Sequence, residues 1–147
     1  MESTTRRENE EKKAYLKRYR AALIAEKQIA EEIEALRLNT MLPSARNGDG
    51  MPHGSGGERD LSDYMASLDK LTRKLYTQMD KRIAIRMEIT QAIESMACEP
   101  EKVLLRYRYI LGYRWEDIGK KMHYSESGVL KLHGQALKNF QIFKRVQ

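Results

Sequence analysis

The chain of 147 residues is poor in cysteine, proline and large aromatic residues, with one Cys, three Pro, one Trp and two Phe. Its single cysteine, Cys98, cannot form an internal disulfide, which favours a protein of the reducing cytosol. We expect Cys98 to be a small buried residue near a helix end rather than a nucleophile. No stretch approaches the roughly 18 apolar residues of a membrane span, and the N-terminus leads into charge. The sequence therefore predicts a soluble, cytoplasmic protein.

Groupings of residues that carry catalytic or metal chemistry are also missing. His53, His123 and His133 have no Cys or carboxylate at metal-ligand spacing, so no metal is predicted. Adjacent acids such as Glu116 and Asp117 point in different directions from a helix and do not form an acid/base pair. We expect no enzyme and no cofactor. His133 is expected to border a helical core as a hydrogen-bonded structural histidine.

Two long segments have the spacing of amphipathic helices. From about Thr5 to Leu42 there is no Gly or Pro, and apolar residues recur every three or four positions. A second such segment runs from Leu61 to about Ala97, with a stripe that shifts after Met79. The apolar stripe residues are Tyr15, Tyr19, Ala22, Ile29, Ile33 and Leu36 in the first segment, and Leu61, Tyr64, Leu68, Leu71, Leu75, Met79, Ile83, Ile89, Ile93 and Met96 in the second.

The stretch from Pro43 to Glu58 separates these helices and is rich in Gly, Pro, Asn and Asp, so a loop is predicted over residues 43–60. It matches neither the Gly-x-Gly-x-x-Gly order nor the Walker lysine pattern, so nucleotide binding is not expected. Helices of similar length joined by a loop favour an antiparallel, coiled-coil-like hairpin. Because such a hairpin seals only one face, we expect it to form a dimer, with an intramolecular bundle as the alternative.

The last third of the chain has the layout helix, tight turn, helix. Trp115, Ile118 and Met122 share one helical face, and Gly119 between them allows a second helix to come close. Ser125 is a good N-cap for the next helix. That helix has an apolar stripe and a polar face. The stripe is Val129, Leu132, Ala136, Leu137 and Phe140, and the opposite face is Ser127, Leu130, Lys131, Gly134, Gln135 and Lys138.

A further helix is predicted to start at Glu99-Pro100-Glu101 and to run to Gly112. Its stripe of Val103, Leu104, Tyr107 and Leu111 is expected to cover the helix-turn-helix, leaving Arg106, Arg108 and Arg114 free to approach phosphates. The positive charge is concentrated here. Residues 99–147 carry ten Lys and Arg against five Asp and Glu, a net +5, whereas residues 1–98 carry seventeen against sixteen, a net +1.

These motifs resemble the C-terminal promoter-reading domain of sigma factors. The resemblance rests on Val103–Tyr109, Gly112-Tyr113, Trp115–Gly119, Met122, Tyr124-Ser125, Val129 and Ala136-Leu137. With a long helical region in front, the chain is similar to the small sigma-like regulators of phages and prophages of Gram-positive bacteria, including the ArpU type. The sequence has no segment similar to the sigma domain that melts promoters. A self-sufficient sigma factor is therefore not expected.

The resemblance implies that the second motif helix enters the major groove of DNA. Its base-proximal positions are then Glu126, Ser127, Leu130 and Lys131. Contacts to the DNA backbone fall to Arg114, Lys120, Lys121, Ser125 and Lys138. Sigma domains usually have arginines early in this helix, where this chain has Glu126, Ser127 and Gly128.

The sequence thus predicts an all-α protein in two domains, a helical hairpin over residues 1–98 and a helix-turn-helix domain over residues 99–147. The expected function is sequence-specific binding of double-stranded DNA as a phage or prophage transcription regulator in a bacterial host cell, with RNA polymerase as a second partner. Two alternatives remain. One is the small DNA-recognition subunit of a phage packaging machine, and the other is a helical scaffold or adaptor with a basic tail.

Overall fold

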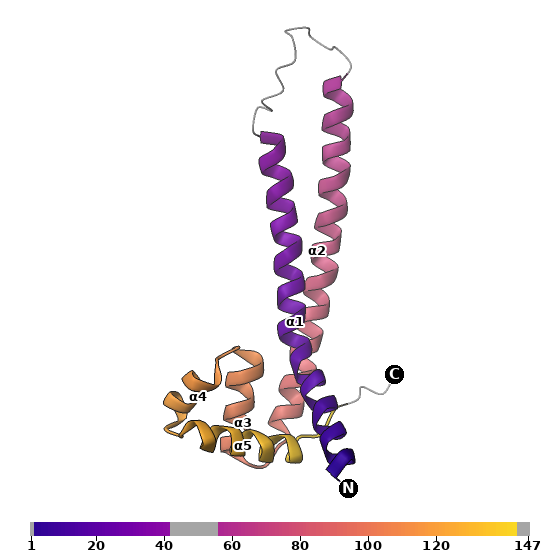
Figure 1. Cartoon of the computed structure of the whole chain (residues 1–147). Helices are drawn as coiled ribbons and strands as arrows, with labels where there is room; N and C mark the ends of the chain where they lie inside the picture. Colours follow the sequence, from indigo (N-terminus) through magenta and orange to yellow (C-terminus); the bar gives the residue numbers. More distant parts are fainter. Residues whose placement is uncertain (1, 42–55, 144–147) are drawn as a thin grey trace. The chain divides into compact units, whose positions relative to one another are not determined.

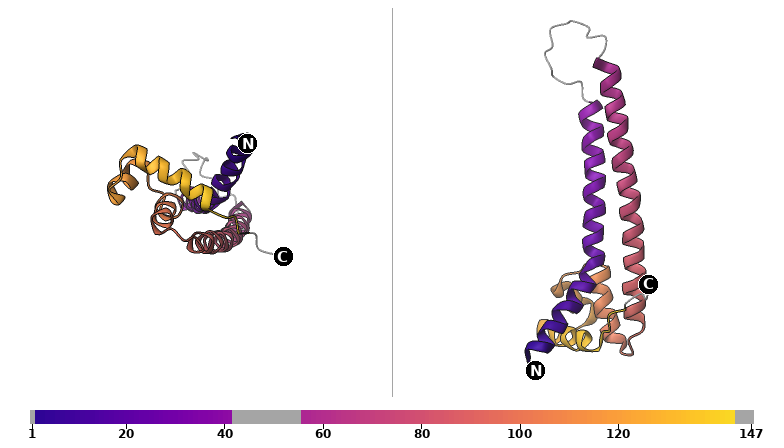
Figure 2. Two further views of the ribbon diagram at one scale, coloured as in Figure 1. Left: turned by 90° about the horizontal axis from the view of Figure 1, so that it is seen from below. Right: turned by 90° about the vertical axis from the view of Figure 1, so that its right-hand side faces the viewer.

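The computed structural model describes residues 2–41 and 56–143, and within these residues the chain is all-helical, as predicted (Figures 1 and 2). Five α-helices and one π-helical turn follow one another in the described parts. They are α1 (Glu2–Met41), α2 (Gly56–Glu94), α3 (Glu99–Leu105), the π-helical turn η1 (Arg106–Ile110), α4 (Trp115–Met122) and α5 (Glu126–Asn139).

The two long predicted helices are present as α1 and α2, with different ends. Helix α2 begins at Gly56, so residues 56–60, which were expected in the loop, are helical. Glycine is tolerated there because the first backbone N–H groups of a helix have no intrahelical partner in any case. The remainder of the predicted loop lies outside the described residues.

The chain forms two compact units, and their limits cut across both long helices. Unit 1 comprises Met1–Leu23 and Lys81–Gln147, and unit 2 comprises Ile24–Asp80. The first turns of α1 and the last turns of α2 therefore belong with α3, η1, α4 and α5.

Unit 2 consists of the adjoining parts of α1 and α2, which run side by side in opposite directions (Figures 1 and 2). Ile29 and Ile33 of the predicted α1 stripe are buried, and Leu36 is half-buried. On α2 the stripe residues from Tyr64 to Met79 are half-buried, but Leu61 is 60% exposed. Leu61 was expected in the contact between α1 and α2. It precedes Tyr64, the first half-buried residue of the stripe, by about one turn.

Unit 1 contains the main hydrophobic core, to which every one of its helices contributes. Its completely buried side chains are Leu16, Ile89, Ile93, Leu104, Leu105, Ile118, Val129, Ala136, Leu137 and Phe140. The predicted α1 stripe is buried here at Tyr15, Tyr19 and Ala22.

On α2, Ile89 and Ile93 are buried as predicted, whereas Ile83 is 46% exposed. The half-buried face of α2 passes through Ile85 instead, so the predicted shift of the stripe was wrong at Ile83.

Helix α1 contacts the end of α5 directly. The Lys12 amino group donates hydrogen bonds to the carbonyl oxygens of Leu137, at 2.8 Å, and Lys138, at 3.4 Å. The Tyr15 hydroxyl donates to the carbonyl oxygen of Phe143 at 3.1 Å, and its ring centroid lies 5.9 Å from that of Phe140. Because the last carbonyl groups of a helix lack intrahelical partners, a cation at this position stabilises α5.

The helix predicted to run from Glu99 to Gly112 changes its winding partway. Its α-helical part ends at Leu105, and η1 follows, with the Leu111 N–H donating to the Arg106 carbonyl oxygen at 3.0 Å. A π turn takes up one more residue than an α turn, which shifts the buried face. Leu105, at the end of α3, and Tyr109, within η1, are both buried, whereas Leu111, expected in the core, is 50% exposed.

Cys98 is exposed, which corrects the expectation of a buried residue. It is the N-cap of α3, in the short connection after α2, where Met96 takes the buried position. The start of α3 is otherwise as predicted, with Pro100 and the acids Glu99 and Glu101 in the first turn.

Candidate nucleic-acid interface

The turn between α4 and α5 consists of residues 123–125. His123 has a left-handed backbone, with φ 60°, and the Tyr124 N–H donates to the Gly119 carbonyl oxygen at 2.9 Å, which ends α4. Ser125 caps α5 as predicted, because its hydroxyl oxygen accepts a hydrogen bond from the Gly128 N–H at 3.1 Å. These local contacts define the end of α4 and the start of α5.

Gly119 allows α5 to approach α4, as its position in the sequence predicted. A Cβ atom at Gly119 would lie 3.0 Å from the Tyr124 carbonyl oxygen and 3.4 Å from Val129 Cγ2. Ile118 beside it is completely buried, while Trp115 and Met122 are half-buried against the same core. The two motif helices therefore pack through the predicted face of α4.

Helix α5 has one buried and one exposed face, and both agree with the sequence. The predicted apolar stripe is buried except for Leu132, which is half-buried. The predicted polar face is exposed throughout and consists of Ser127, Leu130, Lys131, Gly134, Gln135 and Lys138. We call these six residues the α5 outer face.

The four predicted base-proximal residues are all exposed and lie in the first half of α5. Ser127, Leu130 and Lys131 are three and four positions apart, so they lie together on the α5 outer face. Leu130 is 56% exposed although it is a large apolar residue. Glu126 is exposed in the first turn.

The five predicted backbone-contacting residues, Arg114, Lys120, Lys121, Ser125 and Lys138, are also exposed. Arg114 pairs with Asp117 at 3.4 Å, and Lys120 with Glu116 at 3.5 Å. The Lys121 amino group lies 5.0 Å from the centre of the Tyr113 ring. Exposed ion pairs of this kind contribute on the order of 1 kcal/mol or less, so these cations can exchange an acidic neighbour for a phosphate at little cost.

Two arginines that were expected to be free for phosphates are held within unit 1. Arg106 forms an ion pair with Glu94 at the end of α2. The Arg108 guanidinium lies 4.3 Å from the centre of the Trp115 ring and donates a hydrogen bond to the Tyr113 carbonyl oxygen at 3.1 Å. Both arginines belong to η1. Of the three arginines expected to be free, only Arg114 is largely exposed, with 79% of its side chain accessible.

His133 is a structural histidine, as predicted. It is buried on α5, with a ring nitrogen 2.8 Å from the Tyr109 hydroxyl oxygen and its ring centre 4.5 Å from that of Trp115. Burial, followed by the charges of Lys13, Arg108 and Lys17, lowers the pKa of His133 to about 4. Burial raises the pKa of Tyr109 to about 12. Both side chains are therefore uncharged at neutral pH and connect η1 to α5.

A second polar contact, partly buried, joins α3 to the end of α5. The Asn139 side-chain amide donates to the two carboxylate oxygens of Glu101, at 2.9 and 3.2 Å. Glu101 is only 4% exposed, and this contact gives its buried carboxylate group hydrogen-bond partners. The sequence had suggested Glu101 only as a helix-start residue.

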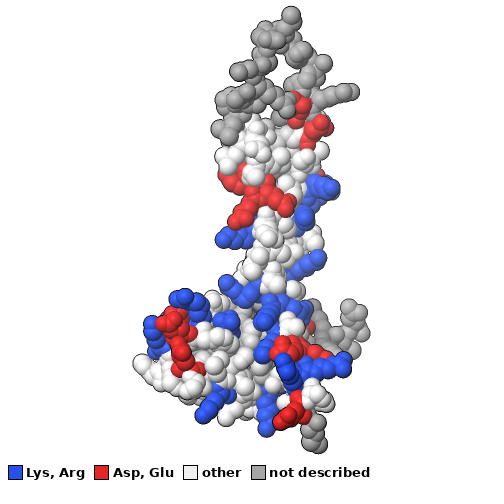
Figure 3. Space-filling view, in the orientation of Figure 1, with Lys and Arg blue, Asp and Glu red and all other residues white. Residues whose placement is uncertain are grey.

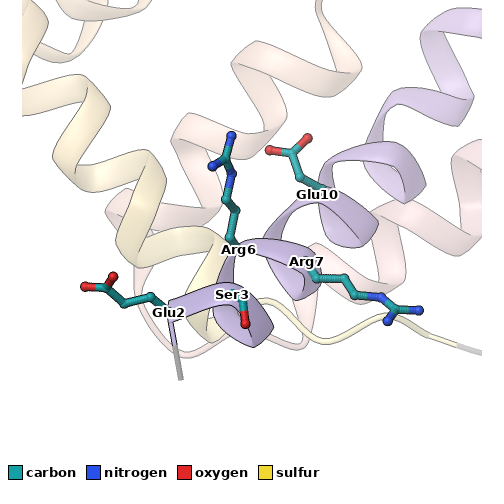
Figure 4. A pocket seen from close by; sticks show the side chains of 5 residues that line it. All are labelled: Glu2, Ser3, Arg6, Arg7 and Glu10. Atoms are coloured by element: carbon teal, nitrogen blue, oxygen red, sulfur yellow. The ribbon is translucent and has the colours of Figure 1, made fainter.

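Cationic side chains are visible over unit 1 in the space-filling view, with acidic groups among them (Figure 3). An open hollow of about 650 Å³ beside the first turns of α1 is lined by Glu2, Ser3, Arg6, Arg7 and Glu10 (Figure 4). Small-molecule sites are lined mostly by apolar residues, whereas four of the five residues that line this hollow are charged.

In the described part of the chain, no three His, Cys, Asp or Glu residues are grouped so as to hold a metal ion, and no helix is long and apolar enough to cross a membrane.

No protein-family model, curated protein or solved structure matches the chain significantly.

Proposed function

We propose that this protein is a sequence-specific regulator of transcription, of phage or prophage type, that binds double-stranded DNA at a promoter through α5. The observation that carries the proposal is the α5 outer face. None of its six residues is buried, while the opposite face of the same helix forms the core. A helix anchored on one side and open along the other can be inserted into the major groove of DNA, which is about 12 Å wide.

The chemistry of the outer face supports base reading. Lys131 is suited to the acceptor edge of guanine, Gln135 to the paired donor and acceptor of adenine, and the exposed Leu130 to the methyl group of thymine. Leu130 is 56% exposed, so its side chain is accessible for such a contact. Arg114, Lys120 and Lys121 supply charge for phosphates next to it.

Variants of the two residue groups test the proposal. We expect Lys131→Ala and Ser127→Ala to reduce discrimination between the preferred duplex and a scrambled one, by roughly 1–3 kcal/mol for a full base contact. Lys120→Ala with Lys121→Ala should weaken binding to every duplex and lower the slope of log affinity against log salt by about one unit for each phosphate that the variant no longer neutralises. Equal losses of affinity for all sequences in both sets of variants would contradict the assigned roles.

The same binding measurements separate the proposal from its alternatives. Strong duplex binding without any sequence preference would favour a packaging subunit. Binding to duplexes no stronger than the electrostatic background would favour a scaffold or adaptor whose basic tail contacts an acidic protein. RNA polymerase as a further partner stays a prediction of the resemblance to sigma factors.

We propose also that the chain pairs with a second copy of itself, through an apolar face of α2 within unit 2. Leu61, Met65, Thr72 and Tyr76 follow each other at steps of four, seven and four residues, so they share a face. Leu61, Met65 and Tyr76 are 60%, 54% and 62% exposed. Thr72 between them is half-buried. Three large exposed apolar side chains on one helix face favour a surface that meets a partner.

The charges beside this face fit an antiparallel copy. Asp69 and Arg73 form an ion pair at 3.1 Å, and both are exposed near the middle of the row. In a two-fold, antiparallel pairing about this point, Asp69 of each copy can meet Arg73 of the other, while Met65 comes opposite the turn that contains Tyr76. The row is therefore complementary to itself, which favours a second copy over a different protein.

A further inference from the structure

One face of α1 in unit 1 is markedly cationic. Arg6, Lys13, Lys17 and Arg20 are seven, four and three residues apart, so they lie on one side of the helix. Arg6, Lys17 and Arg20 are exposed, and Lys13 is half-buried. We call these four residues the α1 cationic face.

Two acidic residues, Glu2 and Glu10, lie on the same side of α1, and Glu10 pairs with Lys13 at 3.0 Å. Figure 4 shows Arg6 and Glu10 extending from the same side of the helix, whereas Arg7 extends away from them. Arg7 pairs with Glu11 at 3.5 Å. The α1 cationic face therefore retains a net positive charge after its own ion pair is counted.

This face adjoins the C-terminal half of α5. Lys12, next to Lys13, donates its hydrogen bonds to the carbonyl oxygens of Leu137 and Lys138. Lys13 and Lys17 are near enough to His133 of α5 for their charges to contribute to its lowered pKa. The Arg20 guanidinium lies against Gly112, where a Cβ atom would be 2.5 Å from Arg20 Cζ, so Arg20 also borders the turn before α4.

Cationic side chains therefore lie near both ends of α5. Helix α4, with Lys120 and Lys121, packs on the N-terminal half of α5 through Gly119 and Val129, and α1 packs at its C-terminal end (Figure 1). With 14 residues, α5 is about 21 Å long, which exceeds the roughly 12 Å width of the major groove. When such a helix is inserted, both of its ends approach a phosphate backbone.

We propose that the α1 cationic face, formed by Arg6, Lys13, Lys17 and Arg20, binds phosphates of the same duplex that α5 reads. This inference rests on the proposed function and extends it, because the sequence had assigned all DNA contacts to residues after 98. The N-terminal helix then supplies sequence-independent affinity at one end of α5, and α4 supplies it at the other.

The test is the salt dependence of duplex binding by the full chain carrying Lys13→Gln with Lys17→Gln. The matched control is Lys70→Gln with Lys74→Gln, which removes the same charge from exposed positions of α2 in unit 2. We expect the first variant to bind every duplex about tenfold more weakly at 0.15 M salt, with a slope of log affinity against log salt lower by one to two units. Its ratio of affinities for preferred and scrambled duplexes should be unchanged, and the control should match the unmodified chain.

The outcomes distinguish this inference from the function on which it rests. If the unmodified chain prefers one duplex and the Lys13/Lys17 variant keeps its affinity and salt slope, the α1 cationic face does not bind DNA. If the unmodified chain shows no binding above the electrostatic background, both the inference and the proposed function fail.

A second measurement checks the geometry without DNA. Because Lys13 and Lys17 help to hold the pKa of His133 low, their replacement by glutamine should raise that pKa in an NMR titration, while the Lys70/Lys74 control leaves it unchanged. An unchanged His133 pKa would place the two lysines away from α5 and would contradict the inference.

Discussion

The Lys12 amino group lies 2.8 Å from the Leu137 carbonyl oxygen, so a residue of α1 donates a hydrogen bond to the last turn of α5, the proposed reading helix. The Phe140 N–H caps α5 by donating to the Ala136 carbonyl oxygen, and Lys12 of α1 adds partners for the next two carbonyl oxygens, those of Leu137 and Lys138. This contact predicts that α5 depends on α1 for its stability.

Lys12→Met should therefore destabilise unit 1. It removes a charged hydrogen bond and a favourable interaction with the helix dipole, together worth on the order of 1–2 kcal/mol, while retaining much of the side-chain packing. Urea denaturation followed by circular dichroism gives the free energy of unfolding. Lys27→Met, at an exposed position of α1 in unit 2, is the control and should leave it unchanged. Equal stability of the two variants would show that the Lys12 contact contributes nothing.

His133 makes stability depend on pH in the acid range. Its pKa is about 4 in the folded chain, below the ordinary value of 6.5, so the unfolded chain binds the proton more readily. The stabilisation is fully present above pH 6.5 and is lost as the pH falls from 6.5 toward 4. We expect a loss of about 2 kcal/mol, less than the full shift implies because solvent partly screens the site.

The comparison with His133→Gln isolates this effect. Glutamine can contact the Tyr109 hydroxyl but does not titrate, so the stability of the variant should vary less between pH 4.5 and pH 7.5 than that of the unmodified chain. Denaturation curves at the two pH values measure the difference. A variant with the same pH dependence as the unmodified chain would assign the effect to other groups.

Gly134 has no packing role in the described part of the chain. It lies in the middle of α5, and a Cβ atom there would have no neighbour within 4 Å. Because glycine costs about 1 kcal/mol relative to alanine inside a helix, Gly134→Ala should raise the free energy of unfolding by up to that amount. If DNA approaches the backbone at this point, the same variant should bind duplexes more weakly.

Measuring both quantities on the Gly134→Ala variant separates fold from function. Higher stability with weaker DNA binding supports close approach of a duplex at the α5 outer face. Higher stability with unchanged binding would remove Gly134 from the interface, and lower stability would mean that a contact in unit 1 requires the glycine.

Pairing of two copies is tested by Tyr76→Glu. A charge placed at Tyr76, the last residue of the exposed α2 row, should prevent burial of that row, so we expect a monomer at micromolar concentration where the unmodified chain is a dimer in sedimentation equilibrium. Tyr76 is 62% exposed, so the substitution should not disturb the fold of a single copy. Dimers of equal stability for both proteins would show that the contact lies elsewhere, and a monomeric unmodified chain would refute pairing.

Local spacing was enough to predict α4, the turn, Ser125 as the cap of α5 and the division of α5 into two faces. Each of these depends on residues within one or two turns of each other, such as Gly119 and Val129. The exposure of all nine predicted DNA-contacting residues followed from the same spacing.

Periodicity did not predict what each buried face would pack against. Leu16 is completely buried beside Tyr15 and Tyr19, which makes the buried face of α1 wider in unit 1 than in unit 2, and this was the available signal that α1 contacts a second partner. The π-helical turn left no comparable signal, because the residues from Arg106 to Ile110 fit an ordinary α-helix equally well. The contacts of Arg106 with Glu94 and of Arg108 with Trp115 join residues from different helices, and periodicity within one helix did not predict them.

The most direct test of the central claim is selection from a random duplex library on the purified chain at near-physiological salt, followed by sequencing of the retained DNA. If α5 reads bases, the retained DNA should contain a recurring sequence motif, and replacement of Lys131 by alanine should relax the preference at one position of it. Retention of duplexes without enrichment of any sequence would contradict the claim that this protein recognises a specific site.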